Sequence, residues 1–261
     1  KPNEFPENEY AANPALPFGQ PESDKLRLFC FAHAGGNAAF FRAWRNLLKP
    51  EIEVVPVQYP GHENRRQESF ATSMSELVEG LAASLRPALT GKFAFFGHSM
   101  GAVAAFELMR TLRRDKGPQP VALIASAARA PQFRLNHQPG PEPSREDLLA
   151  QVKTLGGLPG STFSSVDLLE QLLPALQADT ALYRRYCYLP EEPCDVSIVA
   201  MGGEQDPHVT EVHLEAWQEQ TTQAFTLHRF AGGHFYLISD AEQVLSALKA
   251  ALSRPSLSTA D

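Results

Sequence analysis

Short apolar runs alternate with amphipathic segments along most of the chain. Six apolar runs predict strands, and several are apolar at nearly every position, as expected when both faces of a sheet are covered. The predicted strands span residues 27–32, 53–57, 93–97, 121–126, 196–201 and 225–230. Segments with helical periodicity lie between or after them, at residues 37–48, 73–89, 102–114, 211–220 and 241–252. This order predicts right-handed crossovers and an α/β fold, with a mainly parallel sheet flanked by helices.

The alternation stops between residues 129 and 193. Two helical stretches, residues 144–155 and 166–188, follow one another there without a convincing strand. We expect this segment to be an inserted helical lid, because helices placed beside a site can cover a bound group and exclude water. The alternative is a helical subdomain that only packs. The predicted core comprises residues 24–128 and 194–261, and the predicted lid comprises residues 129–193.

The first 23 residues have a different composition. Prolines lie among polar residues at positions 2, 6, 14, 17 and 21. We expect residues 1–23 to form a flexible or extended arm rather than core. A processed tail and a linker from a larger protein remain alternatives for this arm.

Composition and charge narrow the function. The 261 residues are 43% hydrophobic and 20% charged, which is ordinary for a globular chain with one substantial core. The formal net charge of −7 argues against nucleic acid as a partner, because phosphate binding requires clustered Lys and Arg. No apolar run reaches the roughly 18 residues that span a bilayer, so we expect no membrane segment and a cytoplasmic protein.

The three cysteines lack the paired spacing of zinc or redox sites. Cys30, Cys187 and Cys194 are therefore expected to be reduced, packed thiols. We expect neither a metal site nor a bound cofactor.

The strongest local motif is residues 97–101, GHSMG. A predicted strand runs directly into it and a predicted helix follows, which is the context of a nucleophile elbow. In such an elbow the serine lies on a tight, strained turn between strand and helix. Ser99 is therefore the candidate nucleophile, displayed above the carboxyl edge of the sheet. The helix start behind it offers free N–H groups to a developing negative charge.

A serine hydroxyl needs a general base, and His234 is the best candidate. It lies in residues 231–236, AGGHFY, just after the last predicted strand. The other histidines lack this placement: His33 and His98 lie at strand ends, His228 lies within a strand, and His62, His137, His208 and His213 lie elsewhere.

The acid that orients the histidine should come from a loop after an earlier strand. Asp206 fits, because it follows the predicted strand 196–201 through a short loop. The order Ser99, Asp206, His234 is that of α/β-hydrolases. Glu204 is the alternative acid, nearer the strand end.

An oxyanion hole requires two backbone donors. The elbow itself supplies the N–H of Met100, and we assign the second donor to Ala34 in residues 33–36, HAGG, after the first strong strand. The alternative is that these glycines only permit a tight turn. A phosphate loop is disfavoured because the Walker lysine is absent.

With these residues in hand, the chain resembles the type II thioesterases of polyketide, nonribosomal peptide and siderophore biosynthesis. The similarity extends over most of the chain outside the arm and the extreme C-terminus. The matching motifs are residues 31–36 (FAHAGG), 58–63 (QYPGHE), 96–101 (FGHSMG), 173–179 (LPALQAD) and 232–237 (GGHFYL). Two positions depart from the family's common pattern, His62 and Gln177, where arginine is frequent, and these departures put surface contacts in doubt more than chemistry.

The resemblance implies an α/β-hydrolase fold and a substrate carried as an acyl or aminoacyl thioester on the phosphopantetheine arm of a carrier protein. It also implies that Ser99, Asp206 and His234 are the triad, that Ala34 and Met100 are the oxyanion donors, and that the helical segment is a flexible lid. We expect a monomer that needs no cofactor.

Acidic carrier proteins could be attracted by local arginines despite the negative total charge. The candidates are Arg42, Arg45, Arg65, Arg66, Arg184 and Arg185. Solvated arginines and internal ion pairs are the alternative for each of them. Three other functions stay open: a chain-terminating thioesterase domain, a small-molecule carboxylesterase and a catalytically silent carrier-binding module.

Overall fold

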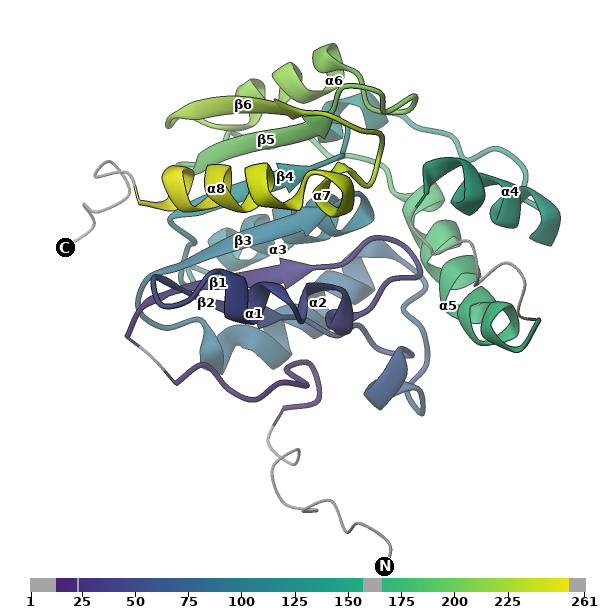
Figure 1. The fold of residues 1–261 in the computed structure, drawn as a ribbon, viewed down its shortest axis with the longest axis horizontal. Helices are drawn as coiled ribbons and strands as arrows, with labels where there is room; N and C mark the ends of the chain where they lie inside the picture. Colours follow the sequence, from purple (N-terminus) through teal and green to yellow (C-terminus); the bar gives the residue numbers. More distant parts are fainter. Residues whose placement is uncertain (1–12, 23, 157–165, 254–261) are drawn as a thin grey trace, which may run out of the picture.

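Six parallel strands form the sheet that the apolar runs predict (Figure 1). The computed structural model describes residues 13–22, 24–156 and 166–253. The strands are β1 (Leu26–Phe31), β2 (Ile52–Pro56), β3 (Phe93–His98), β4 (Ala122–Ser126), β5 (Ser197–Gly203) and β6 (Phe225–Phe230). They pair in the order β2-β1-β3-β4-β5-β6, always in parallel. All six predicted strands are confirmed, and their carboxyl ends meet at one edge.

Helices cover both faces of the sheet. α3 (Met100–Arg114) packs on β3 and β4, and α2 (Met74–Leu85) packs on α3. In Figure 1, α1 (Trp44–Leu47) and α8 (Ala241–Leu252) lie in front of the sheet, whereas α3 lies behind it. Burial on both faces explains why β3 and β4 are buried at every position.

Aromatic side chains fill much of the space around the sheet. Phe29 of β1 packs edge-to-face on Phe93 and Phe95 of β3, with ring centroids 6.0 and 6.2 Å apart. Phe31 packs on Phe95 in the same way at 5.4 Å. This is the preferred arrangement of aromatic pairs, and it joins the strands that precede Ala34 and Ser99.

The prediction of one continuous helix over residues 37–48 is wrong. This segment forms a 3-10 helix, Ala38–Phe41, followed by the short α1. Phe41 and Trp44, three residues apart, both pack on Phe96, with centroids 5.7 and 4.9 Å away. Phe41 ends the 3-10 helix and Trp44 begins α1, so the two side chains that pack on Phe96 lie on either side of the break between the helices.

Two other predicted helices also end early. Residues 73–89 form α2 and then a 3-10 turn, Arg86–Ala88, where Pro87 lacks the N–H that would continue the α-helix. Residues 211–220 form α6 (Glu211–Glu215) and then a 3-10 turn, Ala216–Gln220. α7 (Tyr236–Ser239) has no counterpart among the predicted elements.

The segment between β4 and β5 is helical, as predicted. It contains a 3-10 turn (Pro131–Arg134), α4 (Arg145–Leu155) and α5 (Val166–Arg185). α4 begins with a capping box between Ser144 and Asp147 and ends at Gly156 in the left-handed conformation, which are standard helix start and stop signals. Figure 1 shows both helices beside the carboxyl ends of the strands.

Part of the proline-rich arm packs on the core. Ala15 and Leu16 are buried, and the N–H of Gln58 donates to the carbonyl of Ala15 at 2.9 Å. Residues 1–12 and 23 of the predicted arm lie outside the described residues.

The cysteines are all free thiols. Cys30 and Cys194 are buried as predicted, but Cys187 is exposed rather than packed, because it follows the end of α5. Over residues 13–22, 24–156 and 166–253, the helices are each too short or too polar to cross a lipid bilayer.

Candidate active site

Ser99 occupies the junction between β3 and α3. Strand β3 ends at His98 and α3 begins at Met100. Ser99 has φ 57° and ψ −120°, a conformation that costs a non-glycine residue about 1–3 kcal/mol. Its N–H donates to the carbonyl of Ser126 on β4 at 2.7 Å, which helps hold the strained residue. The tight turn predicted from GHSMG is therefore formed.

The two glycines of the motif are required by close backbone contacts. A Cβ at Gly97 would lie 2.2 Å from the carbonyl oxygen of Gly101. A Cβ at Gly101 would lie 2.2 Å from the carbonyl oxygen of Phe31 at the end of β1. Backbone atoms cannot move aside as the end of a side chain can, so helix α3 and strand β1 can approach only because these positions lack a side chain.

We expect Gly101→Ala to lower the free energy of unfolding by about 3 kcal/mol or more, because overpacking against fixed backbone exceeds the usual 1–3 kcal/mol penalty. Gly80→Ala is the matched control. Gly80 lies on α2 with nothing near its would-be Cβ, so alanine should raise stability by about 0.5–1 kcal/mol. Urea denaturation measures both; similar changes in the two variants would contradict the packing argument.

Asp206 and His234 meet above the carboxyl ends of β5 and β6. His234 Nδ1 lies 2.6 Å from Asp206 Oδ2, and both side chains are buried. The loops that carry them touch closely, because a Cβ at Gly203 would lie 2.1 Å from the carbonyl oxygen of Gly233. The structure therefore brings the predicted acid and base together, which their 28-residue separation does not reveal.

The Asp206 carboxylate has further partners. Its Oδ1 accepts the N–H groups of His208 at 2.8 Å and Val209 at 3.2 Å. Burial opposes ionisation, but the hydrogen bonds and charge of His234 and the two N–H groups outweigh it and hold the pKa of Asp206 below its ordinary value. The alternative acid, Glu204, is exposed, and its backbone N–H donates to the carbonyl of Phe230 at 2.9 Å.

Two more histidines lie beside His234. The rings of His98 and His234 are 5.3 Å apart, and those of His33 and His98 are 5.9 Å apart. Desolvation, reinforced by the charge of His234, lowers the pKa of His33 to about 3 and that of His98 well below its ordinary range. Both rings are therefore neutral near pH 7. His98 Nδ1 also lies 2.9 Å from the hydroxyl of Ser126, so this nitrogen is paired with a serine other than the candidate nucleophile.

The residues of the predicted oxyanion donors, Ala34 and Met100, line the same cavity as Ser99. Met100 is the first residue of α3, so its N–H has no partner within that helix. Ala34 lies in the loop after β1. Within the described parts of the chain, neither N–H forms a hydrogen bond. Oxyanion donors have to lie at the cavity that holds the nucleophile, and both residues meet this condition.

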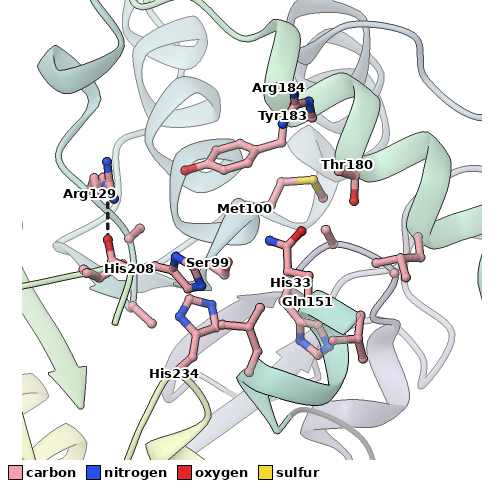
Figure 2. Close-up of a pocket in the computed structure, with 18 of the residues that line it drawn as sticks. His33, Ser99, Met100, Arg129, Gln151, Thr180, Tyr183, Arg184, His208 and His234 are labelled. Atoms are coloured by element: carbon pink, nitrogen blue, oxygen red, sulfur yellow. Dashed lines mark hydrogen bonds between the residues drawn. The ribbon is translucent and has the colours of Figure 1, made fainter. Parts of the chain in front are cut away.

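A cavity of about 380 Å³ opens over Ser99. Figure 2 shows Ser99, His208 and His234 together at one end, with Tyr183 of α5 across the cavity from them. The walls away from Ser99 are mainly apolar and come from the two helices of the inserted segment. They include Leu148, Val152 and Leu155 of α4, and Leu172 and Leu176 of α5. This shape suits a flexible apolar group attached to a reactive carbonyl.

The hydroxyl of Ser99 makes no hydrogen bond to other described residues. Bonds between a nucleophile and its base are often long until substrate binds.

Among residues 13–22, 24–156 and 166–253, no group of three His, Cys, Asp or Glu side chains could hold a metal ion.

One buried pair escaped the sequence interpretation. His62, expected to affect surface contacts, is instead buried, and its Nε2 lies 3.0 Å from Asp179 Oδ2 of α5. The same Asp179 oxygen accepts the N–H of Gly35, next to Ala34, at 2.8 Å. Both residues fall in motifs of the resemblance, at residues 58–63 and 173–179, but their contact joins positions 117 residues apart, and only the fold reveals it.

Comparison with known proteins gives consistent matches over most of the chain. Residues 26–252 match the family described as thioesterase domain. Linear gramicidin dehydrogenase LgrE of Brevibacillus parabrevis is 40% identical over 236 residues, covering 87% of this chain and 88% of LgrE. Gramicidin S biosynthesis protein GrsT of Aneurinibacillus migulanus is 38% identical over 221 residues, covering 85% and 86% of the two chains.

A solved structure matches equally well. The type II thioesterase BorB from the borrelidin biosynthetic cluster superposes with a TM-score of 0.79 at 36% sequence identity, covering 88% of this chain and 94% of BorB. The name of LgrE indicates a dehydrogenase, but no two glycines of the present sequence are separated by a single residue, as the G-x-G-x-x-G dinucleotide fingerprint requires.

Proposed function

The chain belongs to the thioesterase domain family, and from this premise we propose that it is a type II thioesterase that releases acyl or aminoacyl groups from carrier proteins of a polyketide or nonribosomal peptide synthetase. Family membership makes the protein a hydrolase of thioesters with an α/β-hydrolase fold. The observation that carries the finer proposal is the match to BorB, a type II thioesterase, over nearly the whole of both chains.

In the proposed reaction, Ser99 is the nucleophile. His234 takes the proton of the Ser99 hydroxyl through Nε2 while Oγ forms a bond to the thioester carbonyl carbon. The tetrahedral intermediate then collapses, the carbon–sulfur bond breaks, and His234 returns the proton to the departing carrier thiol. A water molecule attacks the acyl-serine with the same base, and the free acid leaves as Ser99 regains its proton.

Asp206 has a supporting role in this proposal. Its contact with His234 Nδ1 holds a proton on that nitrogen, so that Nε2 faces Ser99 as an acceptor. The carboxylate also stabilises the imidazolium that forms when His234 takes the serine proton. The lowered pKa of Asp206 keeps it ionised throughout.

The oxyanion is assigned to the N–H groups of Ala34 and Met100. Both residues line the cavity with Ser99, and their N–H groups have no hydrogen-bond partner in the described structure. Fixed donors aimed at developing charge are usually the largest single contribution to such reactions, and loss of one donor costs about 10²–10³ in kcat.

The helical segment is proposed as the lid. We divide the chain into a core of residues 24–128 and 194–261, an arm of residues 1–23 and a lid of residues 129–193. Leu148 and Leu176 line the cavity from the two helices of this segment. An acyl chain lying among such side chains would be shielded from water until hydrolysis.

The carrier protein is expected to dock near the cavity mouth. Of the arginines considered from the sequence, Arg65 is excluded because it is buried and forms an ion pair with Glu68 at 2.6 Å. Arg185 is engaged by Glu142 at 2.8 Å, but both side chains are more than half exposed, so this pair contributes little and can be exchanged. Arg42 and Arg66 are exposed and remain candidates for steering an acidic carrier.

The direct test is a panel of carrier proteins loaded with different acyl and aminoacyl groups, with unloading followed by intact mass. We expect release of free acid from the carrier to exceed release from coenzyme A and nitrophenyl esters of the same chain length, because only the carrier adds a protein interface. Equal or faster hydrolysis of the nitrophenyl esters would favour a carboxylesterase. Formation of a cyclic product would favour a chain-terminating domain.

A further inference from the structure

Asp179 connects the lid helix α5 to the loop that follows β1. It is buried, and its Oδ2 accepts two hydrogen bonds, one from the Gly35 N–H at 2.8 Å and one from His62 Nε2 at 3.0 Å. The Gly35 N–H belongs to the peptide that joins Ala34 to Gly35. The carboxylate therefore holds the peptide unit adjacent to the proposed oxyanion donor.

The same loop touches α5 directly. A Cβ at Gly35 would lie 3.0 Å from the Cβ of Leu176, one helical turn before Asp179. Gly35 also has a positive φ of 73°, a conformation that glycine adopts without strain. The loop and α5 therefore pack closely at Gly35, so a shift of α5 would displace the loop.

His62 donates hydrogen bonds through both ring nitrogens. Nδ1 lies 3.0 Å from the carbonyl oxygen of Pro60, which can only accept. Nε2 faces the Asp179 carboxylate, which when ionised also only accepts. The ring is therefore an imidazolium, and the pair is a buried ion pair that uses both nitrogens.

From this arrangement we propose that Asp179 and His62 are positioning residues for the loop after β1 that carries Ala34, residues 33–36. Asp179 tethers this loop to α5. His62 neutralises the Asp179 carboxylate, so that the oxyanion hole still favours negative charge. The inference rests on the proposed function, because it takes Ala34 as an oxyanion donor. It adds two residues that are not among those lining the cavity over Ser99.

Neutralisation of Asp179 matters because its buried carboxylate is hydrogen-bonded to the peptide next to the Ala34 N–H. An uncompensated negative charge there would repel the negative charge of the tetrahedral intermediate. Charges interact strongly where water is excluded. With His62 protonated, the pair has no net charge and only its hydrogen bonds act on the loop. If His62 loses a proton, the remaining N–H stays on Nε2, where the carboxylate is the stronger acceptor, so the Nδ1 lone pair faces the Pro60 carbonyl and the neutralisation of Asp179 is lost.

Protonation of His62 depends on the groups around it. Burial alone would lower its pKa, but the hydrogen bonds and charge of Asp179, the Pro60 carbonyl and the charge of Glu63 outweigh burial and raise the pKa above its ordinary value. Tyr59 packs on the ring at 5.8 Å and is neutral, since burial and Asp179 raise its own pKa. The Asp179 carboxylate is therefore neutralised below the pKa of His62 in the folded protein, and this neutralisation is lost as pH rises through that pKa.

The test uses hydrolysis of a short nitrophenyl ester, which needs Ser99 but no carrier. Asp179→Ala should lower kcat by about 10–100-fold with little change in KM, because a misplaced donor weakens the transition state more than substrate binding. The wild-type kcat should also decline at alkaline pH. His62→Arg keeps a positive charge at all accessible pH values, so its kcat should stay level where that of the wild type falls.

Glu170→Gln is the matched control on the same helix. It breaks the exposed ion pair with Arg145 that joins α5 to α4, and it should leave kcat and its pH profile unchanged. Hydrogen exchange of peptides covering residues 33–36 adds a readout independent of activity, with faster exchange expected in Asp179→Ala. Asp179→Asn separates the effect of the hydrogen bond from that of the charge, because the oxygen of its neutral amide can still accept the N–H of Gly35.

The outcomes are distinguishable. An active wild type with an unchanged Asp179→Ala kcat, or with the same alkaline decline in His62→Arg, overturns this inference and leaves the proposed function intact. A wild type that neither hydrolyses the ester nor reacts with a fluorophosphonate at Ser99 overturns the proposed function and this inference with it.

Discussion

Ser99→Ala is expected to reduce kcat for thioester hydrolysis by about 10⁶-fold, the scale seen when the serine of a hydrolytic triad is removed. No other described hydroxyl combines a strained elbow position with exposure to the cavity that His234 also lines. Alanine at position 99 adopts the same φ of 57° with the same difficulty as serine, so the free energy of unfolding should change little.

The measurement is release of free acid from an acyl-loaded carrier, together with labelling of the protein by a fluorophosphonate. Ser126→Ala serves as the control serine, because its hydroxyl lies on the neighbouring strand and bonds to Tyr236 at 2.6 Å rather than facing the cavity. It should still be labelled. Hydrolysis at the wild-type rate by Ser99→Ala would refute the assignment of the nucleophile.

The second large effect concerns the acid. Asp206→Asn should lower kcat by about 10⁴-fold while preserving the fold, because it reverses the hydrogen-bond direction at His234. The amide oxygen would take the place of Oδ1, which accepts from His208 and Val209. The amide NH₂ would then face Nδ1 and force it to accept. The remaining proton would move to Nε2, which could no longer receive the proton of Ser99.

The matched control is Glu204→Gln, which changes the alternative acid in the same loop. Its side chain is exposed, so kcat should stay close to that of the wild type. Stopped-flow measurement of acyl-enzyme formation separates an effect on the first step from an effect on release. If Glu204→Gln lost activity and Asp206→Asn did not, the acid would have to be reassigned to Glu204.

The sheet could be predicted because its strands are buried on both faces. Runs such as residues 93–97 are apolar at nearly every position, and the strand–helix alternation admits few parallel topologies. The helices that were mispredicted are those whose local pattern competes with packing. Phe41 and Trp44 have helical spacing, yet both turn onto Phe96, and that contact lies outside any local window of sequence.

The candidate site likewise has one part that neighbouring residues predict and another part that only the fold reveals. GHSMG predicts a tight turn because its glycines and flanking elements are contiguous, and Ser99 is found in that turn. Asp206 and His234 were proposed from order along the chain, and the fold adds their 2.6 Å contact. Burial distinguishes Asp206 from the exposed Glu204, and it depends on how the loop after β5 is folded against the loop after β6.

By itself, the sequence determined the parallel sheet, the strained serine turn and the chain order of the candidate acid and base, because each of these is encoded in neighbouring residues or in a repeating pattern. The tertiary structure alone decided that His62 is buried against Asp179, that Asp179 binds the loop beside Ala34, and which side chains of the two inserted helices line the cavity. The contacts of Asp179 with His62 and Gly35 join residues more than a hundred positions apart, where burial and charge pairing arise only when the chain closes on itself.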